Sequence, residues 1–382
     1  MMSKNFKYLL SALILLNSLF LCTNAMAVIN CQSSKYYPPA NNTITLAGEF
    51  YAGGELPVGS VIYKTRIDSQ ITGISCNAAF NVPRYFSVTN EPAGPSFNDG
   101  SSSYKGEIYP TNVKGIGVAL LYGNATFTKN SPLERTSLPY KSDKAQDFGI
   151  AGTFYMSLIK TGPIDTGSVV NGVSIPTVIM YAGTKAGYSG LPITTMTVNF
   201  SGSIRFMSQT CQTPDVNVSM GSYEVSEYFR KVGSTTPWID SSIKLENCPT
   251  FTGYYNDANM QIIGGGSGTP SGDSSKSNII QVSLQPLSDF IDNVNGVFAV
   301  SSASGGKEAT GIGLQLGYTP DINASPTTPT KIWKNGVSWS VTPPNNGTAN
   351  FRIPLAARYY QTSQVVTPGP ADGKVVFTIN YK

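Results

Sequence analysis

The chain contains no histidine, and this absence removes much of the chemistry that a protein of 382 residues could carry. Serine or cysteine nucleophiles activated by histidine are excluded, and so is every metal site with a histidine ligand. A pair of carboxylates could still hydrolyse a glycosidic bond, and Asp143 and Asp147 are the nearest such pair in the first half. Their spacing is far more typical of solvated loop charges. We therefore expect a protein that is not an enzyme and that needs neither a cofactor nor a metal.

The remaining chemistry is ligand binding by polar side chains and aromatic rings. Sugars are held by hydrogen bonds from Asp, Asn and Gln, together with an aromatic ring that stacks on the apolar face of the sugar. All three tryptophans lie in the second half of the chain, so Tyr or Phe must supply such a ring in the first half. Three short segments combine these residue types, and their candidate ligand-binding residues are Tyr36, Tyr37, Asn98, Asp99, Tyr104, Gln146 and Asp147. Turn formation or core packing is the alternative interpretation for each segment.

The composition indicates that strands position these residues. The chain has 38 glycines and 25 prolines, and only 13% of its residues are charged. It is rich in residue types that suit pleated surfaces, and no window shows a long amphipathic helix. We expect an all-β protein with two β-sandwich domains, because the chain is too long for one comfortable core. The small net charge of +4 argues against nucleic acid or anionic lipid as the main partner.

The first 27 residues have the pattern of a secretory signal peptide. Two lysines precede an apolar run over residues 9–21, and residues 25–27 form a small-x-small cleavage site. The run is too short to serve as a membrane anchor. We expect an exported protein whose mature chain begins at Val28.

Four cysteines follow the signal peptide: Cys31, Cys76, Cys211 and Cys248. An even number of cysteines in an exported chain indicates disulfides, and four cysteines allow three pairings. Two cysteines lie in each half, so Cys31–Cys76 and Cys211–Cys248 are the economical pairs. Each bond would close a loop of about forty residues and stabilise the fold by roughly 4 kcal/mol.

The boundary between the domains falls after a strand that we expect to end at Phe206. Residues 207–210 form a short polar linker, which divides the mature chain into domains at residues 28–206 and 211–382. Within the second domain, Lys334, Asn335 and Gly336 lie between apolar residues and predict a β-hairpin. Residues 264–277 are rich in Gly and Ser and predict a mobile surface loop.

The last residues of the chain alternate between apolar and polar types. Val375, Phe377, Ile379 and Tyr381 fall at every second position, so they share one face of a strand. An apolar strand at the edge of a sheet is an aggregation hazard, which favours a partner that supplies the missing neighbour. An ordinary closing strand of a sandwich is the alternative.

With these features, roughly residues 206–382 resemble the pilin domain of chaperone–usher fimbriae. The resemblance rests on Cys211 and Cys248, on residues 311–316 and 353–360, and on the spacing of the tail. It implies an incomplete immunoglobulin-like fold that lacks its last strand. A periplasmic chaperone first fills the resulting groove, and an adjacent fimbrial subunit then donates its own strand. The residues implied in this strand binding are Gly369, Val375, Phe377, Ile379, Tyr381 and Lys382.

The first half of the chain indicates which kind of subunit this is. A whole domain occupies the position where an ordinary pilin carries its donor extension, so the chain is expected to accept a strand but not to give one. The layout resembles the two-domain tip adhesins of type 1 and type 3 fimbriae. It implies an outer-membrane usher as a further partner, a place at the fimbrial tip on the cell surface, and a lectin-like first domain that binds a host glycan or glycoprotein receptor. A matrix protein as receptor, or a structural subunit with a capping first domain, are the alternatives.

Overall fold

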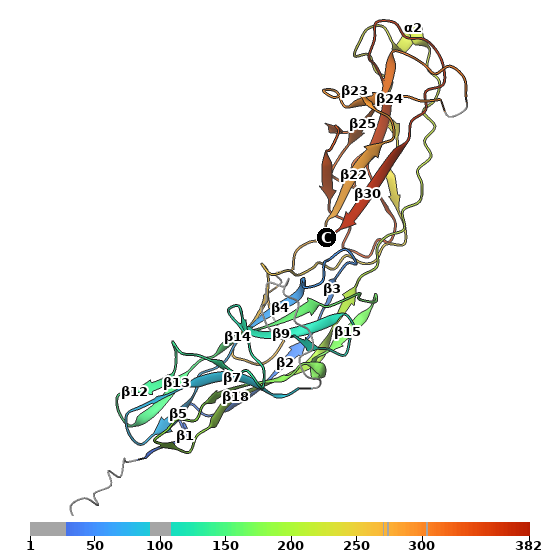
Figure 1. Cartoon of the computed structure of the whole chain (residues 1–382). Helices are drawn as coiled ribbons and strands as arrows, with labels where there is room; N and C mark the ends of the chain where they lie inside the picture. Colours follow the sequence, from blue (N-terminus) through green and yellow to red (C-terminus); the bar gives the residue numbers. More distant parts are fainter. Residues whose placement is uncertain (1–27, 92–107, 270, 273–274, 303–304) are drawn as a thin grey trace, which may run out of the picture.

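The computed structural model describes residues 28–91, 108–269, 271–272, 275–302 and 305–382, and nearly all of its regular structure is β-strand. The expected signal peptide lies outside these residues. Figure 1 shows two bodies arranged end to end, with the first half of the chain in one and most of the second half in the other. None of the described helices is long and apolar enough to cross a bilayer. The prediction of an all-β protein is confirmed.

The first domain is a sandwich of two large sheets. Across one sheet the strands are β10 (Ala125–Thr126), β9 (Ile116–Tyr122), β14 (Thr153–Lys160), β4 (Val61–Asp68) and β21 (Gln261–Ile263), and β8 (Tyr109–Pro110) also pairs with β9. Across the other they are β11 (Leu133–Glu134), β7 (Arg84–Asn90), β16 (Thr177–Ala182), β18 (Ile193–Met207) and β15 (Ser168–Asn171), and β2 (Ala40–Leu46) and β3 (Glu49–Tyr51) also pair with β18. A short 3-10 helix, η1 (Gly172–Ser174), follows β15.

Two smaller sheets extend the sandwich at the end away from the second domain (Figure 1). One contains β13 (Gln146–Ile150), β5 (Thr72–Cys76), β1 (Ile29–Ser33) and β17 (Tyr188–Ser189). The other contains β12 (Tyr140–Ser142) and β6 (Phe80–Val82). Cys31 of β1 lies directly opposite Cys76 of β5 and is bonded to it, so the disulfide ties the first strand of the domain to its neighbour.

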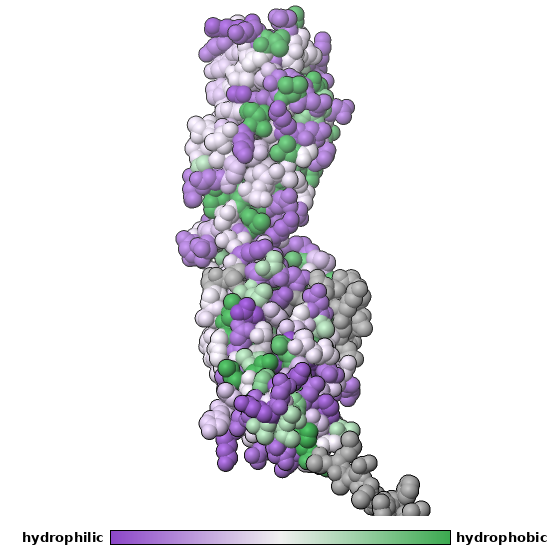
Figure 2. Space-filling view, turned by 90° about the vertical axis from the view of Figure 1, so that its left-hand side faces the viewer, coloured by the Kyte–Doolittle hydropathy of each residue, from purple (hydrophilic) through white to green (hydrophobic). Residues whose placement is uncertain are grey.

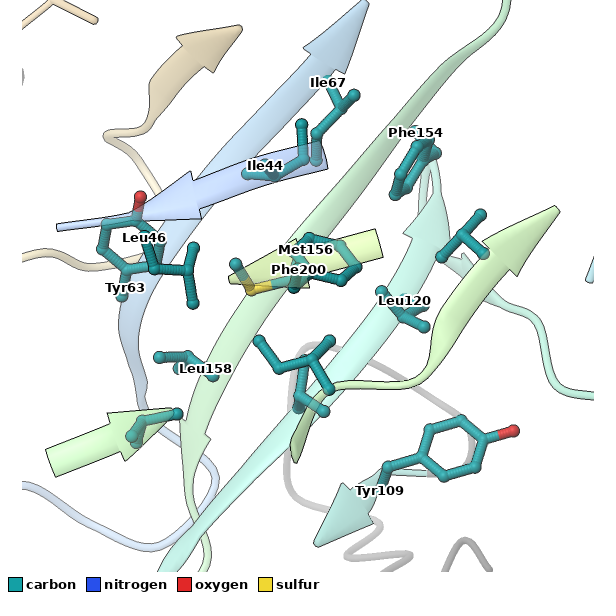
Figure 3. Close-up of a cluster of buried hydrophobic side chains, with 14 of the residues drawn as sticks. Ile44, Leu46, Tyr63, Ile67, Tyr109, Leu120, Phe154, Met156, Leu158 and Phe200 are labelled. Atoms are coloured by element: carbon teal, nitrogen blue, oxygen red, sulfur yellow. The ribbon is translucent and has the colours of Figure 1, made fainter. Parts of the chain in front are cut away.

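The core of the first domain lies between the two large sheets. Alternate residues of each facing strand point inward, as the period of two requires. Figure 3 shows side chains from β2, β4, β14 and β18 that meet in this layer. The buried side chains include Ile44, Leu46, Tyr63, Ile67, Phe154, Met156, Leu158 and Phe200.

The second domain is built from three sheets. The largest contains β19 (Ile239–Asp240), β29 (Leu355–Gln361), β25 (Ile312–Tyr318), β24 (Val297–Ala299) and β23 (Phe290–Asp292), and β26 (Lys331–Ile332) also pairs with β25. The second contains β27 (Ser338–Val341), β22 (Ile280–Pro286) and β30 (Val375–Tyr381). The third contains β20 (Ile243–Leu245) and β28 (Phe351–Ile353), and one helical turn, α2 (Val225–Tyr228), lies at the far end of the domain.

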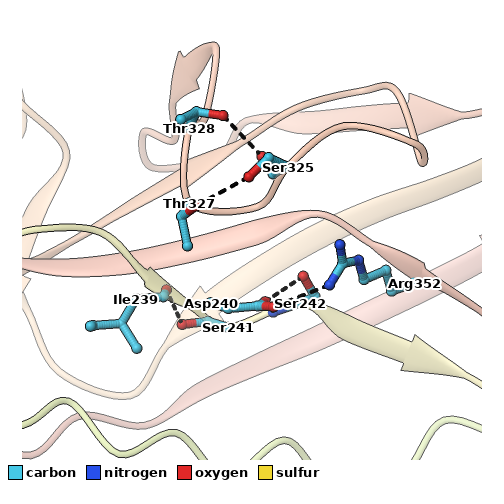
Figure 4. A network of polar contacts seen from close by, with 8 residues as sticks. All are labelled: Ile239, Asp240, Ser241, Ser242, Ser325, Thr327, Thr328 and Arg352. Atoms are coloured by element: carbon cyan, nitrogen blue, oxygen red, sulfur yellow. Dashed lines mark hydrogen bonds and ion pairs between the residues drawn. The ribbon is translucent and has the colours of Figure 1, made fainter.

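Local polar contacts fasten the short strands of this domain. The Asp240 carboxylate accepts hydrogen bonds from the backbone N–H and the hydroxyl of Ser242, at 2.9 and 2.6 Å, and from Arg352 Nη1 at 3.2 Å (Figure 4). These contacts join the end of β19 to β28. The Asp240–Arg352 pair is partly exposed, so it positions the strands more than it stabilises them.

The predicted hairpin at residues 334–336 is wrong, although its turn forms. Gly336 has a φ of 75°, and the Val337 N–H donates to the Lys334 carbonyl at 3.1 Å. The strands on either side separate, however, because β26 pairs with β25 and β27 pairs with β22. The turn therefore carries the chain from one sheet to the other.

Each domain places an aromatic side chain in the core of the other. Tyr51, at the end of β3, is buried in the second-domain core and packs against Phe251. Tyr255 is buried in the first-domain core, where its ring meets those of Phe50 and Tyr63 edge-on. The chain expected to form the second domain thus helps to build the first. The division at residues 207–210 stays a prediction. Tyr51 and Tyr255 each lie on one side of this division in the sequence and in the core on the other side.

Residues 261–268 strengthen the exchange through backbone pairing. β21 runs parallel to β4 at the edge of the first-domain sheet, and the Tyr63 hydroxyl donates to Gln261 Oε1 at 2.7 Å. Gly268 exchanges backbone hydrogen bonds with Thr43 and Thr45 of β2, at 2.9 and 2.8 Å. The segment expected to be a mobile loop is therefore not free at Gly268, because it is bonded to the first domain.

Replacing Tyr255 with Ala should loosen the first domain even though the residue follows the predicted linker. The substitution leaves a cavity between Phe50 and Tyr63, and the expected cost is about 3 kcal/mol. Hydrogen–deuterium exchange at β4 should rise in this variant and should not rise in Tyr36→Ala, since Tyr36 is 80% exposed. Unchanged exchange at β4 would show that the first domain does not depend on the second for its core.

Candidate functional site

The outer edge of β30 is open along its whole length. β30 pairs with β22 on one side and with no other described strand. Lys382 and Ile279 exchange two backbone hydrogen bonds of 2.8 Å, and the Leu287 N–H donates to the Lys374 carbonyl at 2.9 Å. In an antiparallel pair the backbone groups alternate in direction. The N–H and C=O groups of every second residue, from Val375 to Tyr381, therefore point away from β22 into the open edge.

The same alternate residues direct their side chains toward the core. Tyr381 is buried, and Val375, Phe377 and Ile379 are half-buried against the second-domain core. Val376, on the other face of the strand, is 50% exposed. The predicted face of the tail is confirmed, because these four side chains belong to one hydrophobic cluster.

A second unpaired segment lies on the other side of the opening. Residues 213–223 are extended and form no backbone hydrogen bond with any residue that the structure describes. Val216, Val218 and Met220 are half-buried, and the residues between them are exposed. This segment has the side-chain alternation of a strand without the hydrogen bonds of one.

A groove of about 1060 Å³ runs between β30 and residues 213–223. Its floor is formed by apolar side chains of β22, β24, β25 and β29. These floor residues are Leu284, Phe298, Ile312, Leu314, Leu316, Leu355, Ala357 and Tyr359. The arrangement offers an apolar trough with unpaired backbone on both sides, which suits an extended strand.

Gly369 and Lys382 mark the two ends of the tail. A Cβ on Gly369 would collide with the backbone of Ala309 and Lys307, so the close approach of the chain at this point requires glycine. The Lys382 backbone is bonded to Ile279, and its carbonyl also accepts a hydrogen bond of 3.4 Å from Asn278 Nδ2. Both residues therefore hold β30 in place beside the groove.

Two segments proposed as ligand-binding sites in the first domain lie side by side. Asp147, on β13, accepts hydrogen bonds from the Ser34 hydroxyl at 2.6 Å and from the Lys35 N–H at 3.1 Å. The ring of Tyr37 lies over Gly149, where a Cβ would collide with it. Asp147 thus fastens the loop after β1 to the edge of the small sheet, and this loop presents Tyr36 to solvent.

The hydrogen bond from Ser34 lowers the pKa of the Asp147 carboxyl below its usual value, with a smaller contribution in the same direction from the Lys35 N–H. Because the pKa is lowered in the folded chain, this tether is complete at neutral pH. It is lost only when the pH falls through this lowered pKa and the carboxylate is protonated.

The remaining predicted binding residues are not part of this cluster. Gln146 lies at the start of β13, opposite Cys76. Asn98, Asp99 and Tyr104 lie outside the residues that the structure describes. On the face drawn in Figure 2, apolar side chains are scattered among polar ones over the described parts of both domains.

Both predicted disulfides are present. Sulfur–sulfur bonds of 2.02 and 2.08 Å join Cys31 to Cys76 and Cys211 to Cys248. The second bond lies in the core cluster that also contains Tyr51 and Tyr381, so it anchors the start of residues 213–223 beside the end of β30. Among the described residues, no group of three or more acidic, cysteine or histidine side chains could hold a metal.

Comparison with known protein families gives a match to the half of the chain that contains the groove. A family model described as "Fimbrial protein" matches residues 198–382. Residues 198–382 are thus similar to fimbrial protein domains. The resemblance to chaperone–usher fimbrial proteins is thereby confirmed for the residues that were expected to show it, and this family is one of fibre subunits rather than enzymes.

Similar proteins include further fimbrial subunits. The uncharacterized fimbrial-like protein YraH of Escherichia coli K12 is 25% identical over 210 residues, which cover 53% of this chain and 93% of YraH. The CupB6 tip adhesin of Pseudomonas aeruginosa is 12% identical, with a TM-score of 0.34, over 92% of this chain and 94% of CupB6. The receptor binding domain of MrkD1P from Klebsiella pneumoniae is 18% identical, with a TM-score of 0.30, over 48% of this chain and 98% of that domain.

Sequence reasoning identified β30 of the fimbrial domain but missed the other wall of its groove. The alternation of Val216, Val218 and Met220 is a signal of period two that could have found it. The sequence did not predict that Tyr51 and Tyr381 lie close together, because only the packing of the two domains brings them into one hydrophobic cluster.

Replacing Asp147 with Ala should free the loop after β1. Trypsin should then cleave after Lys35 several-fold faster at neutral pH, because the backbone there loses its hydrogen bonds to the carboxylate. Asp143→Ala is the matched control, since Asp143 is a nearby exposed carboxylate with no hydrogen bond to a described residue. Equal cleavage rates in the two variants would show that Asp147 does not hold the loop.

Proposed function

We propose that this chain is a fimbrial tip adhesin. Its second domain accepts a strand from a partner, first a periplasmic chaperone and then an adjacent fimbrial subunit, in an assembly path that includes an outer-membrane usher. Its first domain binds a receptor on a host or other surface. The observation that carries the proposal is the apolar groove beside the open edge of β30.

The groove lacks two things that an inserted strand would supply, backbone hydrogen bonds and apolar side chains. A strand inserted between β30 and residues 213–223 would pair with the backbone groups from Val375 to Tyr381. Its inward side chains would cover the floor formed by residues such as Leu314 and Leu316. Both gains come from one event, because a strand supplies backbone bonds and alternate apolar side chains together.

The tip position is supported by the order of the domains. The residues directly before the groove domain are folded into a sandwich through β18, which is bonded to β16, β15, β2 and β3. A segment held this firmly is not available to pair with another subunit. The chain can therefore accept a strand from the adjacent subunit of the fibre. Its first domain then points outward from the fibre at the cell surface.

Receptor binding is assigned to the loop that presents Tyr36. An exposed tyrosine ring beside hydrogen-bonding groups suits the apolar face and the hydroxyls of a sugar, so a glycan is the favoured receptor. Tyr36, Tyr37 and Asp147 form the cluster, and Gln146 adjoins it on β13. The hydrogen bonds of Asp147 hold the loop in one conformation, which lowers the entropy lost when a ligand binds.

The strand-binding role predicts a sharp difference between two positions on opposite faces of β30. Tyr381→Asp buries an unpaired charge in the core beside the groove and should reduce capture by the chaperone and incorporation into fimbriae at least about tenfold. Val376→Asp, on the exposed face of the same strand, should leave both near wild-type levels. Co-purification with the chaperone and immunolabelling of fimbriae measure the two steps. Wild-type incorporation of Tyr381→Asp would mean that β30 is only a closing strand.

The receptor role is tested with the mature chain bound to its chaperone. We expect this complex to bind glycans on an array, and we expect Tyr36→Ala to weaken binding about tenfold, in keeping with the loss of a stacking ring. Val173→Ala is the control, since Val173 is an apolar residue with 77% exposure elsewhere on the first domain. Binding to matrix proteins but to no glycan would show that the receptor is a protein and not a glycan. Binding to neither would favour a structural subunit.

A further inference from the structure

The groove does not end within the fimbrial domain, because the first domain forms one side of its lower end. A hollow of about 240 Å³ lies there beside the open edge of β30. It is lined by Glu55, which belongs to the loop after β3 in the first domain, and by Thr213, Phe377, Ile379 and Tyr381. A strand that pairs with the end of β30 would therefore meet a carboxylate from the other domain.

The loop that carries Glu55 is held in place by a buried lysine. Lys160 Nζ donates to the carbonyls of Gly53 and Gly54, at 3.1 and 2.9 Å, and Lys160 is only 4% exposed. A Cβ on Gly53 would collide with the Glu55 carboxylate, so this carboxylate lies folded against its own loop. Glu55 itself forms no ion pair with a described residue.

Two buried hydroxyl groups lie close to this end of the groove, that of Tyr381, which lines the hollow, and that of Tyr51. The hydroxyls of Tyr51 and Tyr381 are buried and have no hydrogen-bond partner of normal geometry among the described residues. Burial raises the pKa of Tyr51 and raises that of Tyr381 to about 12, and the nearby Glu55 carboxylate acts in the same direction on both. The acceptor that the hollow offers to an incoming strand is thus the Glu55 carboxylate, with the two buried phenolic groups close to it.

The direction of the incoming strand decides which of its ends reaches the site. Every strand pair described within the second domain is antiparallel. β30 runs toward the first domain and ends at Tyr381 beside Glu55 (Figure 1). A donated strand that continues the antiparallel pattern therefore has its amino-terminal end at Glu55.

We propose that Glu55, in the hollow that it lines together with Tyr381, binds a positive charge at the amino-terminal end of the strand donated to β30. The charge is the side chain of a Lys or Arg residue or a free α-amino group. An ammonium or guanidinium group would donate charge-assisted hydrogen bonds to the Glu55 carboxylate. The inference rests on the proposed strand acceptance, and it adds the first domain to the surface that selects the strand.

The site also favours one orientation of the strand. A strand in the parallel direction would place its carboxyl-terminal end beside Glu55, where like charges repel. The contribution is modest, because Glu55 is exposed and water and salt screen its charge. We expect an effect of about fivefold on affinity at low salt, and a smaller effect at high salt.

The experiment uses the full mature chain, unfolded in guanidinium and refolded with a fluorescent strand peptide that alternates apolar and polar residues. Four peptides differ only at their first residue: acetylated Lys, Ala with a free α-amine, acetylated Ala and acetylated Glu. We expect the first two to bind about fivefold more tightly than acetylated Ala, and acetylated Glu to bind most weakly. Comparing the first two peptides distinguishes a side-chain ammonium from an α-amine.

Three variants of the chain assign the effect to Glu55. In Glu55→Gln the four affinities should converge, and in Glu55→Lys the order should reverse so that acetylated Glu binds best. Glu227→Gln, in α2 at the opposite end of the domain, should retain the wild-type order. An unchanged preference in Glu55→Gln overturns this inference while leaving strand acceptance intact. If no peptide binds any variant, strand acceptance itself fails.

Discussion

The open edge of β30 is the constraint on which the rest of the structure depends. Backbone N–H and C=O groups call for hydrogen-bond partners, and those of four alternate residues of this strand have no partner strand among the described residues. The walls of the groove add a second cost, because half-buried apolar side chains such as Val218 and Phe377 still have surface in contact with water. In the function proposed above, a partner strand removes both costs, and another chain completes the fimbrial domain.

Completion of this domain cannot be separated from the first domain. Tyr51 and Tyr255 cross the boundary in opposite directions, and each is buried in the core of the domain it enters. Such an exchange resists bending at the linker, since any rotation would expose two aromatic rings together. The same packing brings Glu55 to the end of β30 and lets the first domain take part in selecting the strand.

The loop proposed to bind the receptor is held in place by different interactions. This exposed loop is held by the Asp147 carboxylate, which accepts hydrogen bonds from Ser34 and Lys35, and by backbone hydrogen bonds between the loop and Gly73. The Cys31–Cys76 bond holds the strand from which this loop begins. Rigidity near the loop thus comes from hydrogen bonds and a covalent bond, and Tyr36 stays free to contact a ligand.

The sequence by itself determined the features that depend on local order along the chain. The alternation from Val375 to Tyr381 predicted the buried face of β30, and the placement of the cysteines predicted both disulfides. The turn at Gly336 was also correct as a turn, because its residues favour that backbone conformation wherever the strands go. These features follow from the period of a strand, from turn chemistry and from the number of cysteines.

Only the tertiary structure decided which strands pair and what crosses the boundary. The strands beside Gly336 joined different sheets, and β21 joined the first domain although its residues follow the linker. The proximity of Tyr36 to Asp147 and that of Glu55 to Tyr381 likewise depend on contacts between residues far apart in the chain. A periodic pattern specifies which face of a strand is apolar, but it does not specify the neighbour that covers that face, because many strands could supply the same apolar surface.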